Sequence, residues 1–249
     1  MRIIKLNSYD TLSQEAASLI LKEIKKNKNA LLCAATGGSP TGAYGSLKRD
    51  FDLQPDLFSN LRVIKLDEWG GVPINDPCTC EQYLKDHLTG PLHIDSNRYI
   101  AFHSNPGDPL EECGRIQQEL KKAGPIDICI LGLGINGHLA LNEPGEYLET
   151  GVHMAKLSES SLRHPMIKAM AVKPSYGLTL GIGDILQSVF ILLIISGANK
   201  KEITAELLSG KISTRLPASF LWLHPNVVCL IEQESFPPDK LPIRPPTKI

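Results

Sequence analysis

Residues 126–144, IDICILGLGINGHLALNEP, are the clearest indication of the fold in this 249-residue chain. The first six residues form a short and mostly apolar run, and glycines follow at once. A run of this length suits a strand that is buried on both faces, as in a parallel sheet covered by helices. Ligands bind such sheets at the carboxyl ends of the strands, so the glycine-rich loop after residue 131 is a candidate site.

Similar apolar runs alternate with segments of helical period along the chain, which is typical of α/β proteins. The predicted strands are residues 3–6, 30–35, 61–66, 99–102, 126–131, 178–181, 189–195 and 227–231. The predicted helices are residues 12–25, 42–48, 79–88, 110–122, 160–169 and 200–208. The pattern predicts a three-layer αβα fold with a Rossmann-like, largely parallel sheet. We expect a single domain over residues 1–235 and a proline-rich C-terminal tail over residues 236–249.

Composition and charge exclude several classes of partner. A hydrophobic content of 42% can fill a large core, and a net charge of -1 provides no positive field for nucleic acid or an anionic membrane. The amino terminus lacks the apolar segment of a signal peptide, and the longest apolar run, residues 189–195, is too short to span a bilayer. We therefore expect a cytoplasmic protein without nucleic-acid or membrane partners. Whether copies of the chain form a homo-oligomer stays open.

The six cysteines are scattered along the chain. Cys33, Cys129 and Cys229 fall inside predicted strands, so we expect reduced thiols in the core. Cys78 and Cys80 form a C-x-C with no second Cys/His pair at zinc spacing. We therefore expect no metal site.

Residues 36–39, TGGS, follow the predicted strand 30–35 and precede a helix. Gly37 and Gly38 allow a tight turn and close approach to a ligand, and the hydroxyl of Ser39 and the free amides at a helix start suit a phosphate. The alternative is an ordinary turn in which Ser39 caps the helix and Pro40 takes its first position.

Asp67 and Glu68 follow the predicted strand 61–66 and place two carboxylates where a substrate would lie. A carboxylate there can move a proton between carbons of an enolisable sugar, and we expect Glu68 to contact the substrate. The alternative is that these acids cap the next turn or pair with surface cations.

The loop after residue 131 carries His138, whose side chain can give or take a proton near neutral pH. Glu143 follows five residues later, and its carboxylate can hydrogen-bond His138 and raise its basicity. One rival interpretation is a nucleotide-binding glycine loop, because a G-x-G begins the segment at Gly132. A structural turn with a satisfied histidine is the other.

Lys200 follows the apolar run 189–195 and stands at the start of a predicted helix. A cation there opposes the helix dipole unless an anion compensates it. A phosphate shared with residues 36–39 would supply that anion, and a solvated lysine is the alternative.

The blocks TGGSP, LDEW, GLGINGHLALNEP, SGANK and LWLHPN, in this order, resemble the glucosamine-6-phosphate deaminase and galactosamine-6-phosphate isomerase family. The resemblance runs from about residue 3 to residue 232, and its NGH and NEP elements are highly specific. The sequences ASFLWLHPN and LDEW are most similar to the galactosamine-6-phosphate branch.

The resemblance implies an enzyme that opens the pyranose ring, moves a proton between C2 and C1, and expels the 2-amino group as ammonia, without a metal or a cofactor. It implies that Asp67 is the enolisation base, that His138 is the ring-opening acid/base, and that Glu143 orients His138. The residues it implies for substrate binding, the 6-phosphate included, are Gly37, Gly38, Ser39, Gly137 and Lys200.

Two positions depart from the family pattern. Asn136 stands where many deaminases have an aspartate, and we expect it to bind substrate. The arginine with which the family's lid region contacts phosphate has no clear counterpart in residues 158–168. This stretch offers Arg163, His164 and Lys168, of which we favour Lys168.

Two other functions stay open at this stage. A 6-phosphogluconolactonase shares the fold and the glycine-histidine loop, and Glu143 discriminates against it. A non-catalytic sugar-phosphate-binding module is the second alternative. Retention of Asp67, His138 and Glu143 together favours catalysis.

Overall fold

Seven parallel strands form the central sheet in a computed structural model, which describes residues 1–237. The sheet has the order β1-β10-β9-β6-β2-β3-β5. Its strands are β1 (Arg2–Leu6), β2 (Leu31–Ala34), β3 (Arg62–Lys65), β5 (Tyr99–Ile100), β6 (Ile128–Gly132), β9 (Phe190–Ile195) and β10 (Val227–Glu232). Every residue of β2 and of β9 is buried, which confirms the largely parallel, doubly covered sheet that the apolar runs predict.

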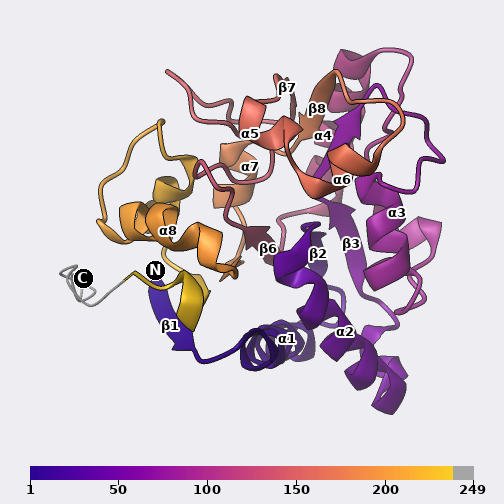
Figure 1. The fold of residues 1–249 in the computed structure, drawn as a ribbon. Coiled ribbons are helices and arrows are strands. Elements are labelled where there is room, and N and C mark those ends of the chain that lie inside the picture. Colours follow the sequence, from indigo (N-terminus) through magenta and orange to yellow (C-terminus); the bar gives the residue numbers. More distant parts are fainter. Residues whose placement is uncertain (238–249) are drawn as a thin grey trace.

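Helices flank this sheet and complete the three layers. They are α1 (Tyr9–Lys26), α2 (Gly38–Leu53), α3 (Cys80–Leu84), α4 (Pro109–Ala123), α5 (Glu159–Leu162), α6 (Pro165–Ala169), α7 (Ile182–Leu186) and α8 (Lys201–Leu208). Helix α1 begins at a capping box between Ser8 and Thr11 and buries Leu12, Ala16 and Ile20 against the sheet. Helices α1 and α2 pack against each other at one end of the molecule (Figure 1).

The register of the central strands places three cysteines in the core. Cys33 of β2 lies opposite Cys129 of β6, which in turn lies opposite Ile191 of β9. Both thiols and that of Cys229 are fully buried and unpaired, so the prediction of reduced core cysteines is confirmed.

A second, antiparallel sheet was not predicted. It contains β4 (Asp67–Gly70), β8 (Tyr176–Thr179) and β7 (His153–Ala155), so residues expected as a loop after β3 form a strand, and β8 lies outside the main sheet. Gly70 permits the pairing with β8, because a Cβ atom there would lie 2.0 Å from the Tyr176 ring.

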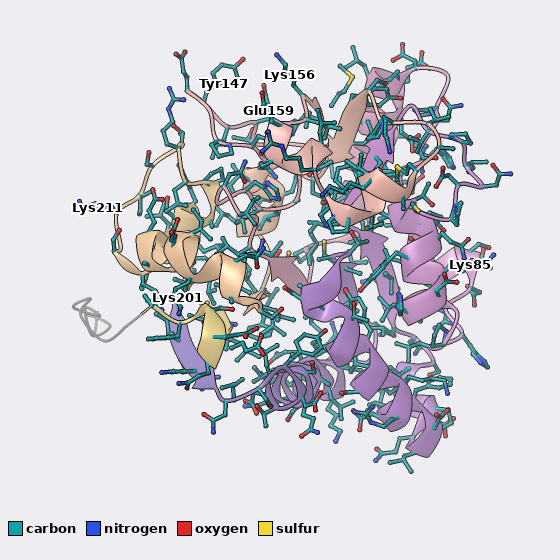
Figure 2. All side chains as sticks on the ribbon, in the orientation of Figure 1. Lys85, Tyr147, Lys156, Glu159, Lys201 and Lys211 are labelled. Atoms are coloured by element: carbon teal, nitrogen blue, oxygen red, sulfur yellow. The ribbon has the colours of Figure 1, made fainter. Side chains whose placement is uncertain are left out.

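Residues 153–179, here called the cap segment, contain β7, α5, α6 and β8. These elements gather at the end of the molecule opposite α1 (Figure 1), and the exposed side chains of Lys156 and Glu159 project from it (Figure 2). The cap segment packs on its own small core, which consists of Trp69, Val72, Cys80, Leu141, Ala155, Leu157, Ile167 and Met170.

The helix predicted over residues 160–169 is interrupted. The structure has α5 and α6 instead, separated by Arg163 and His164. Pro165 explains the break, because proline disfavours helical backbone in the residue before it and cannot continue the hydrogen-bond ladder. His164 therefore lies at a bend, where its ring is free to leave the helix surface.

One large hydrophobic core runs from Leu12 to Ile231, as expected for a single domain. Almost all of the predicted tail, residues 236–249, lies outside the described residues. Among the helices of residues 1–237, none combines the length and the apolar character that a membrane crossing requires.

Candidate active site

Four loops predicted to carry chemistry follow four neighbouring strands. The strands β9, β6, β2 and β3 are adjacent in this order and parallel, so their carboxyl ends lie along one edge of the sheet. The chain runs from β2 outward to β3 and β5, and from β6 outward in the other direction to β9 and β10. The order thus reverses between β2 and β6, the place where open α/β sheets form a ligand-binding crevice.

The loop after β2 presents the start of a helix to this crevice. Gly37 has a φ of +101°, which favours glycine, and α2 begins at the exposed Gly38 without a side-chain cap. The cap position therefore belongs to Gly37 rather than to Ser39. The hydroxyl of Ser39 lies 3.0 Å from that of Ser196, so a hydrogen bond joins the loops after β2 and β9. The uncapped amides of α2 can hold an anion.

Lys200 lies at the start of α8 and is half-buried. Within residues 1–237 its ammonium group has no ion-pair or hydrogen-bond partner, and burial lowers its pKa to about 8. A partly buried cation at a helix N-terminus is favourable only beside an anion. Together with the uncapped start of α2, Lys200 forms a candidate phosphate site.

Asp67 is the first residue of β4 and directly follows the crevice end of β3. Its Oδ1 atom is buried and has no hydrogen-bond partner in the described part of the chain. Burial and the charge of Glu68 raise the pKa of Asp67 to about 7, although Lys65 and the Cys80 thiol act in the opposite direction. A carboxylate with this pKa can accept and return a proton near neutral pH.

Glu68 does not face the crevice, and its predicted contact with substrate is wrong. It is fully buried, and its Oε1 accepts the backbone N–H groups of Trp69 and Cys80 at 2.8 Å each. Its Oε2 accepts the ammonium of the fully buried Lys65 at 2.7 Å and the N–H of Glu81 at 2.9 Å. Neighbouring residues of a strand point to opposite faces, so Asp67 reaches the crevice while Glu68 anchors α3.

His138 and Glu143 lie close together, as their spacing predicts. Nδ1 of His138 is 3.3 Å from Oε2 of Glu143. Gly134 allows the imidazole to lie flat over the loop, because a Cβ atom there would be 2.4 Å from the ring. Burial alone would raise the pKa of Glu143, but His138, Ser161 and Asn136 outweigh it and lower the pKa to about 2. The partner of His138 is therefore a fixed anion at neutral pH.

Asn136 serves Glu143 rather than a ligand. Its Nδ2 donates to Oε2 of Glu143 at 2.8 Å, and its Oδ1 accepts the backbone N–H of His138 at 3.3 Å. Ser161, buried in the cap segment, donates its hydroxyl to Oε1 of the same carboxylate. Asn136, which we expected to bind substrate, thus positions the His138–Glu143 pair. Ser161 does the same, and its only signal in the sequence was a serine-rich helix start.

Gly137 has a packing role. Its φ is +86°, and a Cβ atom there would lie 2.3 Å from Cδ1 of Leu216. Its N–H donates to Gly134 and its carbonyl accepts the N–H of Ala218, each at 3.0 Å. Because both backbone groups are already paired, the predicted contact of Gly137 with substrate is wrong.

Lys168 is exposed on α6, whereas His164 of the cap segment is half-buried and lies beside the loop after β2. A Cβ atom on Gly37 would lie 4.0 Å from Nε2 of His164, and the His164 ring lies 5.8 Å from that of Trp69. The signal in the sequence was a histidine directly before Pro165. In residues 1–237, no group of three or more His, Cys, Asp or Glu side chains is arranged to hold a metal ion.

Residues 7–229 match the family described as glucosamine-6-phosphate isomerases/6-phosphogluconolactonase. This chain belongs to that family. Glucosamine-6-phosphate deaminase 1 of Bacillus subtilis (strain 168) is 37% identical over 94% of this chain and 98% of its own. AgaI of Escherichia coli (strain K12), named as a deaminase, is 39% identical over 91% of this chain and 90% of its own length.

Solved structures agree with this membership. A monomeric glucosamine-6-phosphate deaminase has a TM-score of 0.88 and 36% identity, and the match covers 94% of this chain and 98% of that one. The 6-phosphogluconolactonase of Trypanosoma brucei has a TM-score of 0.75 and 22% identity over 94% and 97% of the two chains. The second likeness shows the shared fold alone. Within the family, this chain is therefore an enzyme of the deaminase/isomerase kind.

Proposed function

We propose that this enzyme converts galactosamine 6-phosphate, in preference to glucosamine 6-phosphate, to a ketohexose 6-phosphate and ammonia. The observation that carries the proposal is the His138–Glu143 contact at 3.3 Å, on the same sheet edge as Asp67, whose buried Oδ1 atom has no partner in the described part of the chain. A hydrolase of a sugar lactone needs no base that enolises a sugar, whereas an aldose–ketose isomerisation does.

In the proposed reaction, the 6-phosphate binds at the amides of residues 37–39 and at Lys200. When the ring opens, His138 takes the proton from O1 and delivers a proton to the ring oxygen. Its Glu143 partner stabilises the imidazolium that forms in the process. The product of this step is an open-chain 2-amino aldehyde.

Asp67 then removes the proton from C2 while solvent supplies a proton to O1, which gives an enolamine. The protonated Asp67 delivers the same proton to C1, and the nitrogen lone pair forms a C2=N iminium group. One water adds to C2, ammonia leaves and one proton returns to solvent, so the sum is amino sugar phosphate plus water to ketohexose phosphate plus ammonia. These steps require no metal or cofactor.

Two elements typical of the galactosamine branch support the epimer preference. Trp69 of the LDEW element is buried in the small core under the cap segment, and its ring lies 5.8 Å from that of His164. The ASFLWLHPN element, residues 218–226, donates the Ala218 N–H to Gly137 in the catalytic loop. Both elements therefore touch the site, where they are able to affect recognition of the sugar.

The test is a set of parallel assays of the purified enzyme with galactosamine 6-phosphate, glucosamine 6-phosphate and 6-phosphogluconolactone. Ammonia release from the first substrate, with a higher kcat/KM than from the second, is the expected result. An enzyme that hydrolyses only the lactone is not a deaminase. A preference for glucosamine 6-phosphate supports the proposed reaction and contradicts the proposed epimer preference.

A further inference from the structure

His164 belongs to the cap segment, but its ring lies at the phosphate loop. Its Nε2 atom is 4.0 Å from the place a Cβ atom would take on Gly37, and its ring lies 5.8 Å from that of Trp69 at a tilt of 41°. Gly37 directly precedes the uncapped start of α2. One polar atom of the cap segment is thus directed at the site proposed for the 6-phosphate.

The other nitrogen of His164 is already occupied. Nδ1 accepts the backbone N–H of Met166 at 3.3 Å, as the N-terminal cap of α6. An acceptor nitrogen carries no proton, so this bond leaves the single proton of a neutral imidazole on Nε2. The N–H donor of His164 therefore points toward residues 37–39.

The surroundings of His164 keep it neutral. Two titratable side chains act on it from the loops beside it, His138 after β6 and Lys200 after β9. Burial, followed by the influence of these two side chains, lowers the pKa of His164. In the part of the chain that the structure describes, no carboxylate forms an ion pair with His164. Protonation would also remove the acceptor that caps α6.

We infer that His164 is the ligand that the cap segment supplies to the substrate phosphate, as a neutral Nε2–H donor whose tautomer is fixed by the Met166 amide. Because His164 is neutral, the positive charge at this site comes from Lys200 and from the start of α2. This inference rests on the proposed function only for the identity of its ligand, a phosphate monoester.

Two substitutions separate the effect of the hydrogen-bond donor of His164 from the effect of the shape of its ring. His164→Phe keeps a ring beside Trp69 but has no donor, and His164→Gln keeps a neutral N–H donor. A donor to a charged acceptor typically accounts for about a 10- to 100-fold change in affinity. We expect His164→Phe to raise the KM for the amino sugar phosphate by that factor with kcat changed less than threefold, and His164→Gln to stay within a few-fold of the wild type.

The matched control is His103→Phe, at an exposed histidine that lines a separate pocket of about 650 Å³ with Pro106 and Arg115. It should leave KM unchanged. Thermal unfolding of each variant verifies that the fold is retained. An unchanged KM in His164→Phe, or an equal loss in His164→Phe and His164→Gln, contradicts the assigned role.

A second measurement does not depend on turnover. Proton–nitrogen NMR of the imidazole rings, with inorganic phosphate as the probe, should show His164 in the neutral Nε2–H form at pH 7.5 before and after saturation, with the Nε2–H resonance shifted by phosphate. An imidazolium signal on saturation would contradict the neutral donor. If phosphate shifts this resonance but no ammonia forms, the proposed reaction fails while the phosphate contact stands.

Discussion

Asp67→Asn should abolish turnover and, at alkaline pH, stabilise the fold. A pKa of about 7 in place of the ordinary 3.8 means that ionising Asp67 is about 4 kcal/mol less favourable in the folded chain than in the unfolded one. Because the folded chain holds the Asp67 proton more tightly than the unfolded chain, Asp67 makes its full contribution to the stability of the fold below pH 3.8. This contribution is lost as the pH rises through about 7, because the unfolded chain gives up its proton first.

The measurement is the free energy of unfolding in urea, for wild type and Asp67→Asn, at pH 5 and at pH 8. An amide does not ionise, so the difference between variant and wild type should move in favour of the variant by about 2–3 kcal/mol between the two pH values. For a chain of this length, that corresponds to roughly 5–10 °C in Tm. Any constant effect of the amide at this site cancels in the comparison.

The exposed Asp56 provides the matched control. Asp56→Asn should give nearly the same difference from wild type at pH 5 and at pH 8. In parallel, the kcat/KM of the wild type should fall about tenfold per pH unit below pH 7, since Asp67 must be ionised to take the C2 proton. A stability difference for Asp67→Asn that does not change with pH refutes the idea of a carboxylate held near neutrality by burial.

Three other substitutions test the remaining parts of the site. His138→Ala should lower kcat by roughly 10²–10⁴-fold with little change in KM, because its proton transfer acts in the transition state, and steady-state ammonia assays measure both constants. Lys200→Ala should raise KM by about 10- to 100-fold for phosphorylated substrates, and equal damage with a non-phosphorylated analogue contradicts a phosphate role. Glu68→Gln should destabilise the fold by about 3 kcal/mol in urea unfolding, since it leaves the buried Lys65 with one partner fewer. Glu159→Gln, in an exposed ion pair (Figure 2), should change stability by less than about 1 kcal/mol.

The order of strands and loops was predictable from local pattern. Buried parallel strands need near-continuous apolar runs, so residues 30–35 and 189–195 can be predicted as strands from the sequence alone. Parallel strands also bring the loops at their carboxyl ends to one edge, which is why Asp67, His138 and Lys200 could be grouped before the structure was known.

The small antiparallel sheet was not predictable in this way. The residues of β4 and β8 are separated by more than a hundred positions, and their pairing depends on the close fit of Gly70 against Tyr176. A strand as short as β7 has too few residues for a periodic signal. Long-range packing therefore decided where the cap segment lies.

The local sequence pattern places the residue types of the site at the carboxyl edge of the sheet, because each of them follows a buried strand. The role of each residue at that edge depends on its tertiary contacts. Glu68 accepts a hydrogen bond from Lys65, and Asn136 donates one to Glu143, so both side chains bond within the protein. Leu216 occupies the space that a side chain on Gly137 would need. A hydrogen-bonding group has limited capacity, and its partners come from distant parts of the chain. A bend at Pro165, which local charge could not reveal, places His164 rather than Lys168 beside Gly37.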